Sequence, residues 1–199
     1  MTVTSTDGVR LGVDVTDPET TPRGTAVLGH PHPLFGGSRH DAVLAAVAAV
    51  LVAHRWRVVR PDFRGAGDAD GVHGGGGPET GDLMAATGLA VPERPLILGG
   101  YSFGADVALA CAPAGLVAWL VIAPPLSVVA PSTMPAARDT RPKFVVVAAH
   151  DTIAPPGRVA ETTADWPATH IAVVDGTDHL FLGATRALQE HVTRLVSSL

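Results

Sequence analysis

The ten residues from Leu96 to Ala105 constrain the fold of this chain more than any other stretch. They read Leu-Ile-Leu-Gly-Gly-Tyr-Ser-Phe-Gly-Ala. The apolar run Leu96–Leu98 is typical of a short buried strand, and the apolar residues after Gly104 predict a helix. Glycine is expected at positions 100 and 104 because a side chain at either would collide with the strand and the helix in so tight a turn. The stretch therefore predicts a strand, a tight turn and a helix, with Ser102 in the turn.

The same turn, Gly100–Gly104, matches the pattern G-x-S-x-G, which is called the nucleophile elbow. In that motif the serine has a strained backbone conformation that lifts its hydroxyl above the sheet. A glycine-rich loop that binds nothing is the alternative, because the chain holds 22 glycines. The strand before and the helix after are the context that the motif requires, so we interpret Ser102 as a candidate nucleophile. Tyr101, inside the turn, is expected to pack rather than to react.

Short apolar runs alternate with helical patterns along the chain. Seven segments are predicted as strands: Val9–Val15, Thr25–Gly29, Trp56–Arg60, Leu96–Leu98, Val117–Ile122, Phe144–Ala149 and His170–Val174. Five are predicted as helices: Asp41–His54, Glu79–Leu89, the residues after Gly104, Gly157–Ala164 and a C-terminal helix with Leu188, Val192, Leu195 and Val196 on one stripe. This alternation predicts one α/β domain over residues 1–199. We expect a doubly wound, mostly parallel sheet of about seven strands with helices on both faces.

Three connecting segments are rich in proline or glycine. Prolines at positions 31 and 33 are expected to exclude a helix from His30–Gly37 and to hold it extended. Asp68–Pro78 contains four consecutive glycines but lacks the ending of a phosphate-binding loop, so we interpret it as a flexible surface loop. Pro124–Pro142 is proline-rich and is predicted to be irregular.

In such a sheet, catalytic and ligand-binding side chains lie just past the carboxyl ends of the strands. The candidates at those positions are His30, His32, Asp62, Ser102, Asp151 and His179. A serine hydroxyl needs a base to take its proton as it attacks, and imidazole suits because its pKa lies near neutrality. A buried carboxylate then orients the imidazole. Ser102, Asp151 and His179 supply this set, in an order along the chain that is known for such sites.

Other acidic residues compete with Asp151 for the orienting role. Asp175 and Asp178 lie so near His179 in the sequence that reaching its ring would need an unusual loop path. Asp62 is interpreted as a structural turn former. For Asp151 itself, the structural alternative is a helix cap ahead of the two prolines at 155 and 156.

The oxyanion that forms during acyl transfer requires N–H donors that are already in place. The N–H of Phe103, directly after the candidate nucleophile, is one. The second donor is expected from the loop after the first parallel strand, where two prolines have no N–H. His32, Leu34 and Phe35 remain as candidates there, and we favour His32 from its place in the turn.

The composition limits the function classes. A net charge of −5 and an isoelectric point near 5.9 argue against nucleic acid and membrane surfaces as partners. The longest apolar run, Ala42–Ala53, is too short to span a bilayer, and Met1–Asp17 lacks the apolar middle of a signal peptide. One cysteine, Cys111, excludes an internal disulfide and is expected to be buried. We therefore expect a cytoplasmic protein, and thirteen arginines against one lysine suggest a bacterial source.

These residues resemble one family, the α/β-hydrolases. The likeness covers nearly the whole chain from Gly24 onward and rests on His30–Gly37, Asp62–Gly67, Gly100–Ala105, Ala123–Pro125, His150–Thr152 and Gly176–Phe181. The chain looks like the small lidless branch near dienelactone hydrolases, and most like short bacterial serine hydrolases with a His-Pro-His-Pro-x-x-Gly-Gly loop. The resemblance implies a Ser-His-Asp triad and a small acyl substrate, with carboxylic esters expected, cleaved through an acyl-enzyme intermediate.

The chain departs from the family pattern at the rim of the expected site. Asp68 stands where a serine is usual, and the tetraglycine loop is richer in glycine. Dienelactone hydrolases proper use a cysteine nucleophile, whereas position 102 is serine, so their specific activity is not expected. Pro124–Pro142 corresponds to the lid of larger relatives and is too short for a multi-helix cap. We therefore expect an open, shallow site that takes small acyl groups.

Two other function classes are compatible with parts of the sequence. His30-x-His32 has the spacing of a zinc-binding pair, but a third ligand would be needed, and barrels built on this pattern have about 250 residues. A binding protein that keeps the triad unused on the same fold is the second alternative. No G-x-G-x-x-G after a strand, no Cys-x-x-Cys and no phosphate-binding loop is present, so no cofactor or metal is expected.

Overall fold

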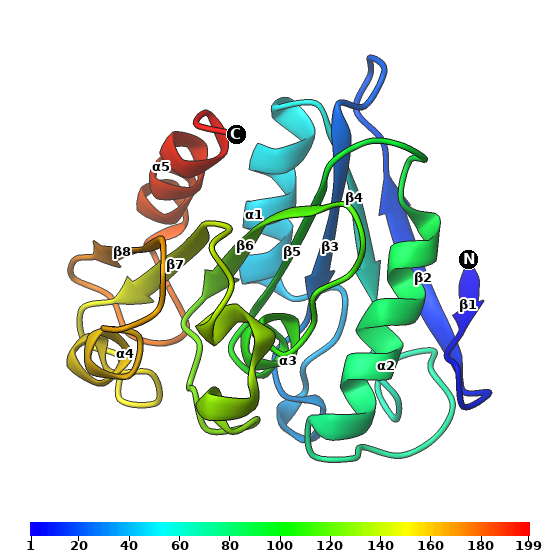
Figure 1. Ribbon diagram of the computed structural model, residues 1–199, viewed down its shortest axis with the longest axis horizontal. Coiled ribbons are helices and arrows are strands. Elements are labelled where there is room, and N and C mark those ends of the chain that lie inside the picture. The colour runs from blue at the N-terminus through cyan, green and yellow to red at the C-terminus, as the bar shows by residue number, and fades with distance from the viewer.

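The computed structural model describes residues 1–199 as an α/β domain built on one eight-stranded sheet. In chain order the strands are β1 (Thr2–Thr4), β2 (Arg10–Thr16), β3 (Gly24–Gly29), β4 (Trp56–Pro61), β5 (Leu96–Tyr101), β6 (Leu116–Ile122), β7 (Lys143–Ala148) and β8 (Thr169–Val174). Their order across the sheet is β1-β2-β4-β3-β5-β6-β7-β8, from right to left in Figure 1. The six neighbouring strands from β4 to β8 are parallel, and β2 pairs antiparallel with both β1 and β4.

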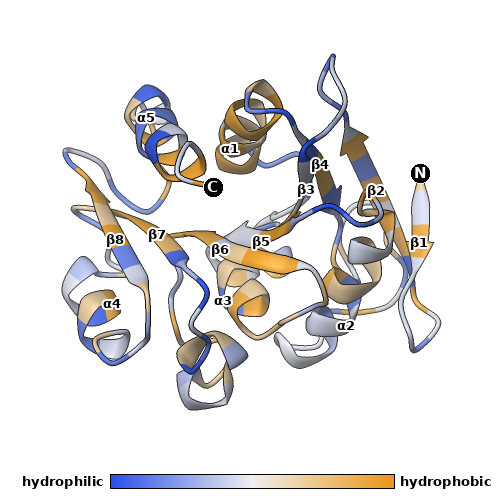
Figure 2. Cartoon of the chain, turned by 45° about the horizontal axis from the view of Figure 1, so that its top comes forward, coloured by the Kyte–Doolittle hydropathy of each residue, from blue (hydrophilic) through white to orange (hydrophobic).

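Five α-helices cover the two faces of the sheet. They are α1 (Ala42–Ala53), α2 (Gly77–Ala86), α3 (Phe103–Leu109), α4 (Pro156–Thr162) and α5 (Thr185–Val196). Figure 2 shows α1 and α5 on one face and α2, α3 and α4 on the other. The predicted fold class, a mostly parallel doubly wound sheet, is therefore confirmed. None of these helices is long and apolar enough to cross a bilayer.

The core lies on the central strands, and Figure 2 shows hydrophobic stretches on β5, β6 and β7. Every residue of β3, β5 and β7 is buried. This burial follows from parallel pairing, because strands covered on both faces need apolar residues at every position rather than at alternate ones. On α5, Leu188, Val192 and Val196 are buried, so the predicted apolar stripe does face the core.

The sequence prediction missed two local features. The strand β1 has only three residues, mostly exposed, and so carries no periodic pattern. The segment His30–Gly37 is not extended throughout, because Pro33–Phe35 forms one turn of 3₁₀ helix. Pro33 stands in the first position of this turn, where its fixed φ fits and its missing N–H costs nothing.

The segment Pro124–Pro142 forms no helical cap, as predicted. It contains only two single 3₁₀ turns, Pro131–Thr133 and Pro135–Ala137. Its start is fixed by the buried carboxylate of Asp106 on α3, which accepts hydrogen bonds from three successive backbone N–H groups, those of Leu126, Ser127 and Val128. The face above the carboxyl ends of the strands is consequently left open.

Candidate active site

Ser102 occupies the turn between β5 and α3 in a strained conformation. Its backbone angles are φ 53° and ψ −118°, which L-residues rarely adopt and which cost about 1–3 kcal/mol. A Cβ added to Gly100 would lie 2.4 Å from the carbonyl oxygen of Gly104, and one added to Gly104 would lie 2.2 Å from that of Gly29. The expected need for glycine at both positions is confirmed, since helix and strand pack too closely for any side chain.

Three strand ends bring Ser102, His179 and Asp151 together. Ser102 follows β5, Asp151 follows β7, and His179 follows β8. The Nε2 atom of His179 lies 2.9 Å from the hydroxyl oxygen of Ser102, and its Nδ1 lies 2.7 Å from Oδ2 of Asp151. All three residues are buried except for a small exposed fraction. The arrangement is therefore a continuous chain of hydrogen bonds from carboxylate to imidazole to hydroxyl.

The surroundings of Asp151 keep it ionised. Burial alone would raise the pKa of this carboxyl group, but hydrogen bonds from His179 and from the N–H groups of Ala154 and Ile153 lower it below its ordinary value of 3.8. An ionised carboxylate only accepts hydrogen bonds, so Nδ1 of His179 is the protonated ring nitrogen. Nε2 is then left with a free lone pair that faces the hydroxyl of Ser102.

Tyr101 holds the main chain of His179 in place. Its hydroxyl donates a hydrogen bond of 2.8 Å to the main-chain oxygen of His179, and the two ring centroids are 5.4 Å apart. The competing carboxylates do not reach the imidazole: Asp178 accepts from the N–H of Leu180, and Asp175 is exposed. Asp151 is thus the carboxylate that hydrogen-bonds His179.

Two backbone N–H groups beside Ser102 have no partner within the protein, those of Phe103 and His32. The other candidates in the His30–Gly37 loop are occupied. The N–H of Leu34 donates to Nδ1 of His32 at 3.3 Å, and the N–H of Phe35 donates to the oxygen of His32 at 3.1 Å. The rings of His32 and Phe103 lie 5.1 Å apart, so the two free donors belong to residues in contact.

A cavity of about 240 Å³ opens over the hydroxyl of Ser102. Its walls are Pro31, His32, Phe35, Gly36, Gly37, Asp41, Tyr101, Ser102, Ile153, His179 and Leu180. Phe35, Ile153 and Leu180 are largely exposed, so the mouth of the cavity carries an apolar rim that no lid covers. Asp41 is the one carboxylate in the walls, and no arginine or lysine takes part.

Comparison with solved structures identifies the fold. The chain superposes on an α/β serine hydrolase homologue from Coxiella burnetii with a TM-score of 0.88 and 26% identity, covering 98% of this chain and 95% of that one. An α/β serine hydrolase without lid from Xanthomonas campestris gives a TM-score of 0.89 and 27% identity, covering 100% and 93%. The chain belongs to the α/β-hydrolase superfamily.

Sequence comparison adds less to this assignment. No protein-family model matches the chain. An 89-residue segment is 36% identical to an uncharacterized protein of Rickettsia prowazekii, covering 42% of this chain and only 37% of that relative. The superfamily assignment therefore rests on the solved structures.

His73, which lies beside this α/β-hydrolase site, was not among the residues predicted from the sequence. Its ring packs against those of His32 and Phe103, with centroids 4.7 and 5.2 Å away. The glycine-rich loop that carries His73 is held by the buried Glu79, which accepts from the N–H groups of Gly74 and Gly76 at 2.6 and 2.7 Å. Glu79 stands three residues after Gly76, and this capping-box spacing was the signal available in the sequence.

His30 and Asp62, both at strand ends, serve the structure of this hydrolase fold. His30 is fully buried, its Nδ1 lies 2.6 Å from the oxygen of Pro31, and its Nε2 accepts from the N–H of Phe63 at 2.9 Å. Both ring nitrogens are occupied, so His30 has no lone pair to offer a metal beside His32. Asp62 is also fully buried and pairs with Arg39, which agrees with the structural role predicted for it.

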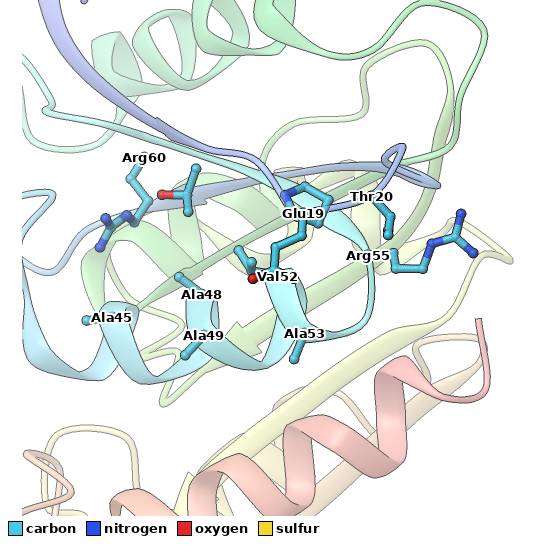
Figure 3. Close-up of a pocket in the computed structure, with 11 residues that line it drawn as sticks. Glu19, Thr20, Ala45, Ala48, Ala49, Val52, Ala53, Arg55 and Arg60 are labelled. Carbon is cyan, nitrogen blue, oxygen red and sulfur yellow. The ribbon is translucent and has the colours of Figure 1, made fainter.

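A larger cavity of about 720 Å³ lies between α1 and the β2–β3 connection (Figure 3). Small side chains of α1 form one wall, with Glu19 and Thr20 facing them and Arg55 and Arg60 at the sides. No serine, cysteine or histidine lines it. The only cysteine, Cys111, is buried as predicted, and burial raises its pKa to about 12. Ser102 and His179 line the smaller cavity and not this one.

Proposed function

We propose that this protein is a serine hydrolase that cleaves small carboxylic esters with Ser102, His179 and Asp151 as its catalytic triad. The hydrogen bond that the hydroxyl of Ser102 donates to Nε2 of His179 carries the proposal, because it aligns a base with a nucleophile. The α/β serine hydrolases that superpose on the chain add support. That the chain lies near the dienelactone hydrolases within this superfamily stays a prediction.

The reaction follows from these positions in two halves. Oγ of Ser102 attacks the acyl carbon while Nε2 of His179 takes its proton, and Asp151 stabilises the imidazolium that forms. The N–H groups of Phe103 and His32 donate to the oxyanion. His179 then gives the proton to the leaving alcohol, and the acyl-enzyme remains. A water molecule, deprotonated by His179, releases the acid and restores Ser102.

The open cavity supports a small substrate. About 240 Å³ of space and an apolar rim suit a short acyl chain, and no segment covers the rim. The chemistry needs no metal or cofactor. The net charge of −5 and the single cysteine favour a small-molecule substrate in the cytoplasm over nucleic acid or a membrane.

Hydrolysis of 4-nitrophenyl butyrate by the purified wild type and two variants tests the proposal. Ser102→Ala should remove hydrolysis down to the background rate. Asp151→Asn should lower kcat by about 10²–10⁴-fold, because the imidazole would lose its orientation and its charge partner. Full activity in Ser102→Ala would place the nucleophile elsewhere. A folded wild type inactive on esters, thioesters and amides would instead favour a binding protein with an unused triad.

A further inference from the structure

Asp41 lies in the wall of the Ser102 cavity, and only one of its two carboxylate oxygens accepts hydrogen bonds from the protein. It is the N-cap of α1, and Oδ1 accepts from the N–H groups of Val43 and Leu44 at 2.8 and 3.1 Å. Oδ2 accepts no hydrogen bond from the protein. Capping the helix uses one oxygen, so the other is free to meet a ligand in the cavity.

No arginine, lysine or histidine forms an ion pair with this carboxylate. Arg39, two residues before Asp41, is paired with Asp14, Asp62 and Asp68. Arg158 donates to the backbone oxygens of Pro125 and Ile153. Neither arginine is part of the cavity wall.

The charge of Asp41 reaches the catalytic turn. Burial is the main cause of the raised pKa of Tyr101, and the negative charges of Asp41, Asp151 and Asp178 add to it. Tyr101 directly precedes Ser102 and lines the same cavity. Asp41 therefore places a negative charge in the same cavity as Ser102, beside the apolar rim.

We infer that Asp41 selects substrates by charge, so that the site accepts apolar esters ending in a cationic group and disfavours esters ending in a carboxylate. The apolar chain lies against Phe35, Ile153 and Leu180, and the cation lies near Oδ2 of Asp41. This inference rests on the proposed function and names its substrate class. The cavity is small and partly desolvated. Relative to an uncharged ester, repulsion by Asp41 should lower kcat/KM about tenfold for an ester ending in a carboxylate, and attraction should raise it about tenfold for one ending in a cation.

The test compares three 4-nitrophenyl esters whose acyl chains end in a methyl group, a carboxylate or a trimethylammonium group: pentanoate, hemisuccinate and 4-(trimethylammonio)butanoate. Asp41→Asn removes the charge but keeps an N-cap, since asparagine caps as well as aspartate. Asp41→Ser is a second neutral cap in case the first variant folds poorly. Asp175→Asn is the matched control, because it removes one exposed aspartate charge outside the cavity.

The measured quantity is the cation-to-anion ratio of kcat/KM, compared between variants so that the intrinsic reactivity of each ester cancels. We expect the ratio to fall at least tenfold in Asp41→Asn. Asp175→Asn should keep the wild-type ratio. An unchanged ratio in both Asp41 variants, or a wild type that prefers the hemisuccinate, would overturn the inference.

Binding separates this inference from the proposed function. In a Ser102→Ala background, NMR titration with butyltrimethylammonium and with pentanoate needs no turnover. The cation should bind at least tenfold more tightly than the anion, and adding Asp41→Asn should abolish the preference. If the cation preference depends on Asp41 while no ester is cleaved, the proposed ester hydrolysis is wrong and the inferred charge selection is supported. Equal affinity for both probes, unaffected by Asp41→Asn, would reject charge selection whether or not esters are cleaved.

Discussion

At the residue scale, His30 joins the two loops that frame the site. Its Nδ1–H donates to the oxygen of Pro31, and its Nε2 accepts from the N–H of Phe63. If Nε2 were protonated, its N–H would face the N–H of Phe63, and the positive charge of the ring would be buried away from water. Burial accordingly lowers the pKa of His30 to about 4. The neutral ring is part of the folded structure.

We predict that His30 stays neutral in the folded protein down to about pH 5. In the unfolded chain its pKa returns to 6.5, so only the unfolded state gains the proton between pH 6.5 and 4. This residue should therefore lower the free energy of unfolding by about 1.4 kcal/mol per pH unit as the pH falls through that window, and by nothing above it. The Cε1–H resonance of His30 measures its protonation directly. Titration of that resonance near pH 6.5 in the native protein would refute the prediction.

At the element scale, the junction of β5 and α3 depends on the close approach of backbones. The first turn of α3 lies against the end of β3, and a Cβ on Gly104 would come within 2.2 Å of the oxygen of Gly29 and 2.6 Å of that of His30. In α2, by contrast, a Cβ on Gly81 would meet nothing closer than the hydroxyl of Thr6 at 3.9 Å.

Glycine-to-alanine substitution in these two helices should have opposite effects. Gly104→Ala should destabilise the fold by about 3 kcal/mol, because rigid carbonyl groups must move apart. Gly81→Ala should stabilise it by about 0.5–1 kcal/mol, since alanine restricts the unfolded chain and favours helix. Urea unfolding of both variants and the wild type measures the difference. A destabilised Gly81→Ala together with a neutral Gly104→Ala would show that backbone packing at the turn is wrongly described.

Sequence predicted the elements wherever a periodic or apolar pattern was long enough to identify them. The helix expected over Asp41–His54 is α1, with these two residues as its caps. Local turn geometry and strand pairing account for the differences. The two prolines predict an extended segment, yet Pro33 begins a 3₁₀ turn that Gly36 closes with φ 84°. The three residues of β1 form a strand only because β2 pairs with them.

At the scale of the whole molecule, parallel strand ends converge on one edge. Ser102, Asp151 and His179 were therefore predictable from the G-x-S-x-G turn, their positions after strands and their order along the chain. Two other residues were not predictable in this way. His73, on a long loop, packs against His32 beside the cavity, and Asp41, at a helix cap, is part of the cavity wall. Neither position follows from periodicity, because it depends on how the loops fold over the sheet.

The open architecture predicts a preference for short acyl chains. Pro124–Pro142 builds no cap, so a long chain would leave its distal methylenes in water and gain no further burial. Across 4-nitrophenyl esters from acetate to dodecanoate, kcat/KM should peak among the short chains and decline beyond about eight carbons. A steep rise beyond eight carbons would require a covered apolar trench and would contradict this description.

The most direct test of the central claim is covalent labelling of the nucleophile. The purified protein is treated with a fluorophosphonate probe and the adduct is located by mass spectrometry, with Ser102→Ala as the control. An aligned base should make Ser102 reactive, so we predict one adduct per chain, on Ser102, and none in the variant. A folded wild type that stays unlabelled, or that is modified at another residue, would contradict the assignment of Ser102 as an activated nucleophile.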